Sequence, residues 1–99
     1  MSDEANFGFA APPFDAEQAL LQLKRSLRDL KLSERGNGFE VRGKRVVELE
    51  LEGALIRARL ARRLALTPEW DRREIRSSAE QRKCVDDIKK RIERWERDE

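Results

Sequence analysis

The residues with the clearest capacity for chemistry are arginines, and they gather in the segment 54–63. This segment carries four arginines and no acidic residue, although the whole chain has a net charge of only +2. Guanidinium groups bind phosphates and carboxylates through paired hydrogen bonds. With three arginines that follow, they form a candidate site for the phosphates of a nucleic acid or for an acidic partner: Arg57, Arg59, Arg62, Arg63, Arg72, Arg73 and Arg76.

Acidic residues precede the basic segment with the same spacing. Three glutamates alternate with apolar residues over 48–52, as Arg57 and Arg59 do further on. If the two runs pair as neighbouring strands, glutamates lie beside arginines, and each such pair contributes roughly 0.2–1 kcal/mol. We therefore expect the glutamates to neutralise Arg57 and Arg59, and we expect Arg62 and Arg63, which lie beyond the glutamate row, to be the least neutralised. The alternative function of these arginines is to solvate a strand end and protect it from aggregation.

Side chains for catalysis or metal binding are scarce. The sequence has no histidine and one cysteine, Cys84, so it lacks the Ser–His and Cys–His nucleophile pairs and the commonest metal ligand. Cys84 borders an apolar helical stripe and is interpreted as a core residue. The glycines do not have the spacing of a phosphate-binding loop. We expect a protein that is not an enzyme, with no catalytic residue, no metal and no cofactor.

Two aromatic features are candidates for binding a protein partner. Residues 1–13 are expected to form an apolar tail, because Pro12 and Pro13 interrupt any helix. Phe7 and Phe9 in this tail either fold back onto the domain or form a short motif that docks into a partner. Trp70 either fills the edge of the core or serves in recognition.

The elements that would position these residues centre on the segment Phe39–Arg63. Alternation of apolar and charged residues is typical of strands with one buried face. A two-residue loop at Gly53 is expected to join two such strands. With Glu52 and Gly53 as the loop, Leu49 faces Ile56; with Gly53 and Ala54, Leu49 faces Ala58. Both registers place glutamates against arginines.

A further strand is expected before these two. Phe39 and Val41 point the same way in a strand, and pairing them with the next strand requires an odd-numbered loop around Gly43, such as a three-residue loop. Residues 33–38, with two glycines, predict a turn. The sequence therefore predicts a three-stranded antiparallel meander.

Helical periodicity flanks the meander on both sides. Asp15 is a good N-cap, with Gln18 at the capping-box position, and apolar residues recur at spacings of three and four up to Leu30. The second helix is expected from Ser78 to about Arg97, and its apolar stripe consists of Val85, Ile88, Ile92 and Trp95.

The segment between the meander and the second helix has two interpretations. Thr67 and Pro68 resemble a helix start, so one interpretation is a helical turn over 68–72. The alternative is a fourth edge strand over 70–76.

Assembled, these elements predict an α+β fold, with the order α-β-β-β-α in two layers and both long helices on one sheet face. The order is similar to that of double-stranded RNA-binding domains and of a small dimeric nucleoid-associated family. The resemblance to the first covers topology, with Arg82 and Lys83 at the start of the second helix. The histidine-bearing loop of that family is missing, and fold order alone does not carry function.

Length and composition set the remaining expectations. We expect a tail over 1–13 and one domain over 14–99. The acidic N-terminus lacks the pattern of a secretory signal, and no apolar run approaches the ~20 residues that span a bilayer. The sequence thus predicts a cytoplasmic interaction domain without membrane contact. It is expected to bind a protein partner or itself, and weak nucleic-acid binding is the alternative.

Overall fold

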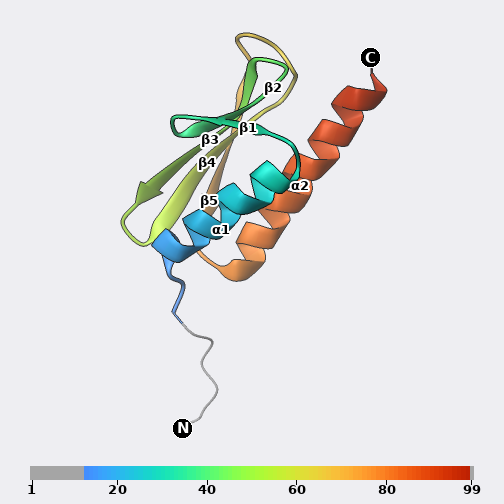
Figure 1. Ribbon diagram of the computed structural model, residues 1–99. Helices are drawn as coiled ribbons and strands as arrows, with labels where there is room; N and C mark the ends of the chain where they lie inside the picture. Colours follow the sequence, from blue (N-terminus) through green and yellow to red (C-terminus); the bar gives the residue numbers. More distant parts are fainter. Residues whose placement is uncertain (1–12, 99) are drawn as a thin grey trace, which may run out of the picture.

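The structure is a computed structural model that describes residues 13–98. Two helices flank five strands in chain order (Figure 1). The elements are α1 (Ala16–Asp29), β1 (Ser33–Arg35), β2 (Gly38–Val41), β3 (Lys44–Glu52), β4 (Leu55–Ala61), β5 (Trp70–Ile75) and α2 (Ser78–Arg97). The strands form one antiparallel sheet in the order β1-β2-β3-β4-β5. The predicted α+β class is confirmed, and the sheet has one strand more than expected at each edge.

The pairing of β3 with β4 fixes the register of the glutamates and arginines. Glu52 pairs with Leu55, so Gly53 and Ala54 form the loop, and Leu49 faces Ala58. Gly53 has a φ of 58°, a conformation that a glycine adopts without strain. Of the two registers compatible with the sequence, the structure has the one with this Gly53–Ala54 loop.

The loop between β2 and β3 is shorter than predicted. Val41 pairs with Lys44, so the loop contains only Arg42 and Gly43, whose φ angles of 53° and 78° are those of a primed hairpin turn. The expectation of a three-residue loop is therefore wrong. That loop was expected to bring Phe39 and Val41 beside the apolar residues of the next strand. A bulge within β3, where Val46 has no partner on β2, shifts the register by one residue instead.

The first edge strand, β1, was expected to belong to a turn. Only Gly36 and Asn37 connect β1 to β2, and Ser33 already pairs with Glu40. All three residues of β1 are exposed, so this strand has no apolar alternation by which the sequence would reveal it. A short, polar strand is typical of a protected sheet edge.

The other edge strand, β5, corrects the expectation of a helical turn over 68–72. Trp70 pairs with Ala61 and Ile75 pairs with Ile56, which agrees with the alternative of an edge strand. The backbone N–H of Arg62 donates to the carbonyl of Glu69 at 3.0 Å and closes the loop ahead of the strand. Pro68 lies in this loop instead of opening a helix.

Both helices begin as the sequence predicts. The Asp15 carboxylate accepts a hydrogen bond from the backbone N–H of Gln18 at 3.1 Å. The Ser77 hydroxyl accepts one from the N–H of Glu80 at 3.1 Å, and the Glu80 carboxylate accepts one from the N–H of Arg76 at 2.6 Å. These bonds satisfy donors that a helix N-terminus otherwise leaves without partners.

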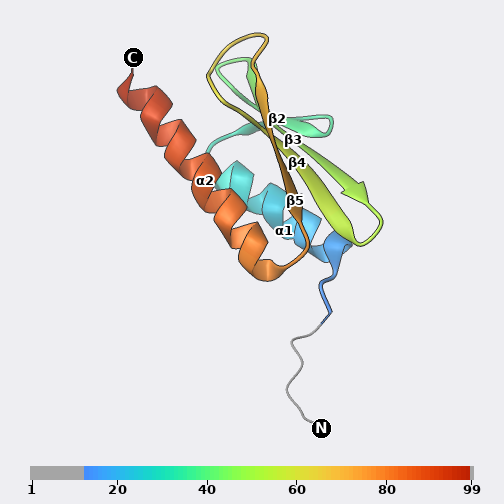
Figure 2. The ribbon, with the colours of Figure 1, turned by 180° about the vertical axis from the view of Figure 1, so that it is seen from behind.

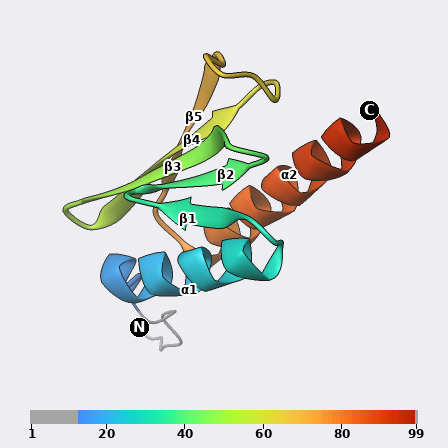
Figure 3. The same ribbon diagram turned by 45° about the horizontal axis from the view of Figure 1, so that its top comes forward.

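The core lies between the sheet and the helices. α1 packs against β3 and β4, α2 packs against β5, and the helices contact each other; Figures 2 and 3 show this arrangement from behind and from the top. On α2 the buried row is Cys84, Ile88 and Trp95. Cys84 therefore belongs to the core row and not to its border, while Val85 and Ile92 are only half-buried. Among the residues described, neither helix has the length and apolarity to cross a membrane.

Candidate binding surface on the open face of the sheet

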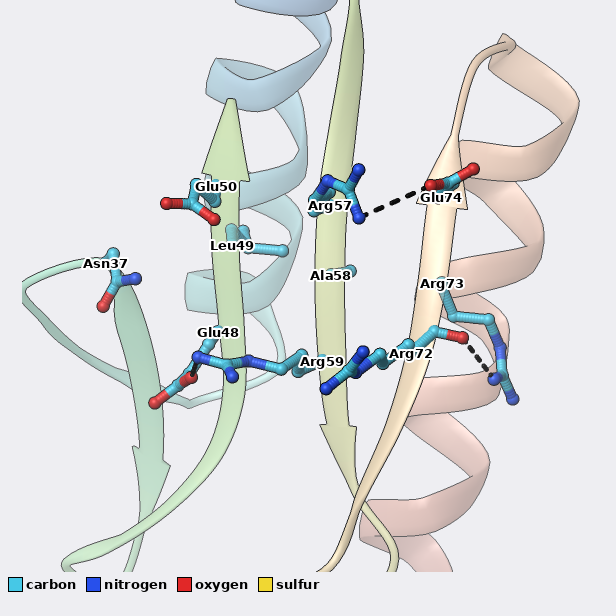
Figure 4. A pocket seen from close by; sticks show the side chains of 10 residues that line it. All are labelled: Asn37, Glu48, Leu49, Glu50, Arg57, Ala58, Arg59, Arg72, Arg73 and Glu74. Carbon is cyan, nitrogen blue, oxygen red and sulfur yellow. Dashed lines mark hydrogen bonds and ion pairs between the residues drawn. The ribbon is translucent and has the colours of Figure 1, made fainter. Parts of the chain in front are cut away.

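Figure 4 views the sheet with both helices behind the strands. We call the near side, which the helices leave uncovered, the open face. Strand pairing arranges its charged side chains in two rows across β3, β4 and β5: Glu48, Arg59 and Arg72 in the first, and Glu50, Arg57 and Glu74 in the second.

In the first row, Arg59 is held from two sides. One of its guanidinium nitrogens forms an ion pair with Glu48, and its Cζ lies 5.9 Å from the centre of the Trp70 ring. That distance is within the range of a cation–π contact. Glu48 also binds Arg45, with Nε 2.6 Å from Oε2. The charge of Arg59 is thus matched by a carboxylate that it shares with Arg45.

In the second row, the ion pairs differ from those expected. Glu50 and Arg57 are direct partners in the register, but Arg57 forms its ion pairs with Glu52 and with Glu74, the latter at 3.6 Å. A long side chain reaches diagonal neighbours as well as direct ones. Glu50 itself has no ion pair among residues 13–98, so the predicted neutralisation of Arg57 holds with other glutamates.

Arg45 closes one border of the open face and was not singled out from the sequence. Its guanidinium donates to the carbonyl of Arg35 at 3.1 Å and to the side chain of Asn37. It lies directly over Gly38, where an added Cβ would come within 2.5 Å of the Arg45 Cζ. Only glycine leaves room for this contact, which ties the β1–β2 turn to β3.

The remaining candidate arginines are split between paired and unpaired ones. Arg62 binds Asp71 at 2.7 Å and Glu69 at 3.3 Å, so the expectation that it is among the arginines least neutralised by carboxylates is wrong. The hydrogen bond with Asp71 raises the pKa of Arg62 and lowers the pKa of Asp71. Arg76 binds Glu74 at 2.6 Å. In the described part of the chain, Arg63 and Arg72 form no ion pair.

Arg73 points to the helix side and joins a polar network that sequence reasoning missed. It binds Asp87 of α2 at 3.2 Å. Arg91, also on α2, binds Asp87 and Asp71 at 2.9 Å each and donates to the carbonyl of Ala61 at 3.0 Å. Burial opposes the charge of Arg91, but hydrogen bonds to the two carboxylates outweigh it and raise its pKa. This network fastens α2 to β4 and β5.

The other candidate residues have structural positions or lie outside the described range. Trp70 is half-buried and packs against the core. Burial raises the pKa of Cys84 to about 11, so its thiol stays protonated near neutral pH. Phe7 and Phe9 fall outside residues 13–98.

The open face carries both signs of charge. Its groups are ion-paired arginines and glutamates and the rim of Trp70, together with Arg72 and Glu50, which form no ion pair with residues 13–98. No group of three or more carboxylates or thiols within residues 13–98 is arranged to hold a metal ion. The chain matches no protein-family model, no curated protein and no solved structure.

Proposed function

We propose that the chain is a non-enzymatic interaction domain that binds a protein partner through the open face. The observation that carries the proposal is the pairing of charges. Five of the seven candidate arginines already bind carboxylates: Arg57, Arg59, Arg62, Arg73 and Arg76. We also propose, as the sequence predicts, that both helices cover one face of the sheet and that the protein acts in the cytoplasm.

Paired arginines disfavour a polyanionic ligand. Binding to nucleic acid gains its free energy largely from cations that replace the counterions of the phosphates. On the open face, phosphates would have to displace Glu48 from Arg59, and both Glu52 and Glu74 from Arg57. They would then lie close to the released carboxylates. The resulting repulsion costs much of what the new contacts gain.

A protein surface with both signs of charge fits this arrangement better. Glu50 on β3 and Arg72 on β5 form no ion pair within residues 13–98, and each is exposed. They lie in different rows with β4 between them, so a partner would place a base near the first and an acid near the second. Complementary charges of this kind fix orientation and select the partner. The exposed rim of Trp70 adds apolar contact area, which is common at the centre of interfaces.

The alternative is weak nucleic-acid binding. It is favoured by Arg63 and Arg72, which have no carboxylate partner in the described part of the chain, and by the aromatic ring of Trp70 beside Arg59. The two proposed functions involve overlapping sets of arginines. They differ in whether a protein or a nucleic acid contacts these arginines.

The test is photo-crosslinking inside cells that express the full chain. A photoreactive amino acid is placed at position 50, at position 72 or, as a control, at Lys89 on the exposed side of α2. We expect a discrete protein adduct from positions 50 and 72, resistant to nuclease and weakened by Arg72→Glu in the position-50 variant. Adducts that disappear with nuclease favour the alternative, and equal adducts from position 89 contradict a specific open-face interface.

A further inference from the structure

A second surface, remote from the middle of the open face, gathers cations that form no ion pair with the described residues 13–98. Figures 1 and 2 show the β4–β5 loop at the same end of the sheet as the C-terminal end of α2. A groove of about 610 Å³ lies there, which we call the end groove. It is lined by Lys44, Arg62, Arg63, Leu64, Arg94, Trp95 and Asp98.

The charges of the end groove are not balanced like those of the open face. Lys44, Arg63 and Arg94 form no ion pair with any residue from 13 to 98, and Arg62 is already bound to Asp71 and Glu69. Asp98 is the one acidic residue of its lining. The dipole of α2 favours a cation in its last turn, which explains Arg94 but neither Lys44 nor Arg63. Three cations without an ion pair among residues 13–98 therefore line one groove, from β3, the β4–β5 loop and α2.

The remaining lining is apolar and well ordered by the core. Trp95 is 8% exposed and Leu64 is half-buried against the core cluster. Leu64 and Trp95 therefore give the groove a floor that packs on the core, next to its charged side chains. The groove thus combines fixed walls with charged side chains at its rim.

We infer that the end groove binds a compact anion with a diphosphate group. Two guanidinium forks and one ammonium suit phosphate oxygens, since arginine binds them in pairs and lysine acts as a point charge. The cations meet in one groove instead of following a line, and the neighbouring Arg62 is neutralised. This footprint fits a single small polyanion better than the repeated phosphates of a nucleic-acid backbone. The inference does not depend on the proposed protein partner.

The test is a titration of the full chain with inorganic pyrophosphate and with ADP. In a Trp70→Phe variant, Trp95 is the only tryptophan, so its fluorescence reports on the end groove. Isothermal calorimetry on the unmodified chain provides an independent measurement. We expect saturable binding that weakens with salt. Equal affinity for both ligands assigns the site to the diphosphate alone, and tighter binding of ADP assigns it to a nucleotide.

Variants separate a site from general attraction. Arg63→Ala and Arg94→Ala should each weaken binding about tenfold or more, because each removes a charged hydrogen-bonding partner, and Asp98→Asn should tighten it. Arg82→Ala and Lys89→Ala change the net charge equally on another part of α2 and should leave binding unchanged. The inference is overturned if calorimetry shows no saturable binding, if the control variants weaken it as much, or if short duplex RNA binds the groove more tightly than pyrophosphate.

Discussion

Replacing Arg91 with methionine should destabilise the fold more than any change to an open-face arginine. The Arg91 side chain is 11% exposed. It joins α2 to the sheet through Asp71 and the carbonyl of Ala61, and it also binds Asp87 on its own helix. Methionine keeps most of the aliphatic volume, so the change removes mainly the charge and its hydrogen bonds. The carbonyl of Ala61 then loses the hydrogen bond that Arg91 donates to it.

The magnitude follows from what the two carboxylates retain. Removing one member of a buried ion pair costs about 3–5 kcal/mol. Here Asp71 and Asp87 are 21% and 32% exposed, and each keeps a second arginine, Arg62 or Arg73. We therefore expect a smaller loss, about 2–3 kcal/mol in the free energy of unfolding, which corresponds to about 10–20 °C in Tm for a domain of this size.

Urea unfolding followed by far-UV circular dichroism measures this loss. The matched control is Arg57→Met on the open face, where the side chain is 48% exposed and the expected cost is below about 1 kcal/mol. A cost for Arg91→Met no larger than that of the control would refute the role assigned to the network. A double-mutant cycle with Asp71→Asn should also give a coupling energy between the two positions.

Three further predictions concern acid stability, thiol reactivity and the β1–β2 turn. The ion pairs lower the pKa of Asp71, and they also lower that of Asp87, although burial opposes this. The folded chain should therefore lose stability as the pH falls below about 4, the ordinary pKa of an aspartate. Urea unfolding at a series of pH values should show that this loss is smaller in the Asp71→Asn variant. Cys84, with its pKa raised to about 11, should react with a thiol reagent at pH 7 only after unfolding; rapid labelling of the native chain would contradict its burial. Gly38→Ala should cost no more than about 1 kcal/mol in unfolding free energy, because the new methyl group displaces only the flexible guanidinium end of Arg45 and weakens its surface contacts, and the same change in an Arg45→Ala background should cost less.

The helices and the centre of the sheet were predictable because their signals are local. Asp15 and Ser77 are recognisable N-cap residues, and the alternation around Leu49 and Ile56 shows which side of each strand is buried. The sequence pattern fits two registers of β3 against β4 equally well, since both keep apolar residues opposite one another, so it could not decide between them. The structure resolves it through the loop at Gly53 and Ala54.

The edges of the sheet were not predictable in the same way. β5 carries charges at four successive positions, Asp71 to Glu74. Arg72 and Glu74 lie on the open face, whereas Asp71 and Arg73 form ion pairs with residues of α2. No alternation of apolar and polar residues results, and Thr67 with Pro68 resembles a helix start. Because β5 was not recognised as a strand from the sequence, the partners of Arg62 were missed as well. Asp71 becomes a neighbour of Arg62 only when β5 lies beside β4.

The central claim is that neighbouring glutamates occupy the arginines of the open face and so keep polyanions away. The most direct test is the binding of a short RNA duplex, followed through the side-chain Nε resonances of Arg57 and Arg59 at low and at physiological salt. It is measured in the unmodified chain and in the triple variant Glu48→Gln/Glu52→Gln/Glu74→Gln, which removes every carboxylate bound to these arginines among residues 13–98. The account predicts that these resonances hardly move in the unmodified chain, and that the triple variant gains salt-dependent binding with clear shifts. Tight, salt-sensitive binding that shifts both resonances in the unmodified chain would contradict it.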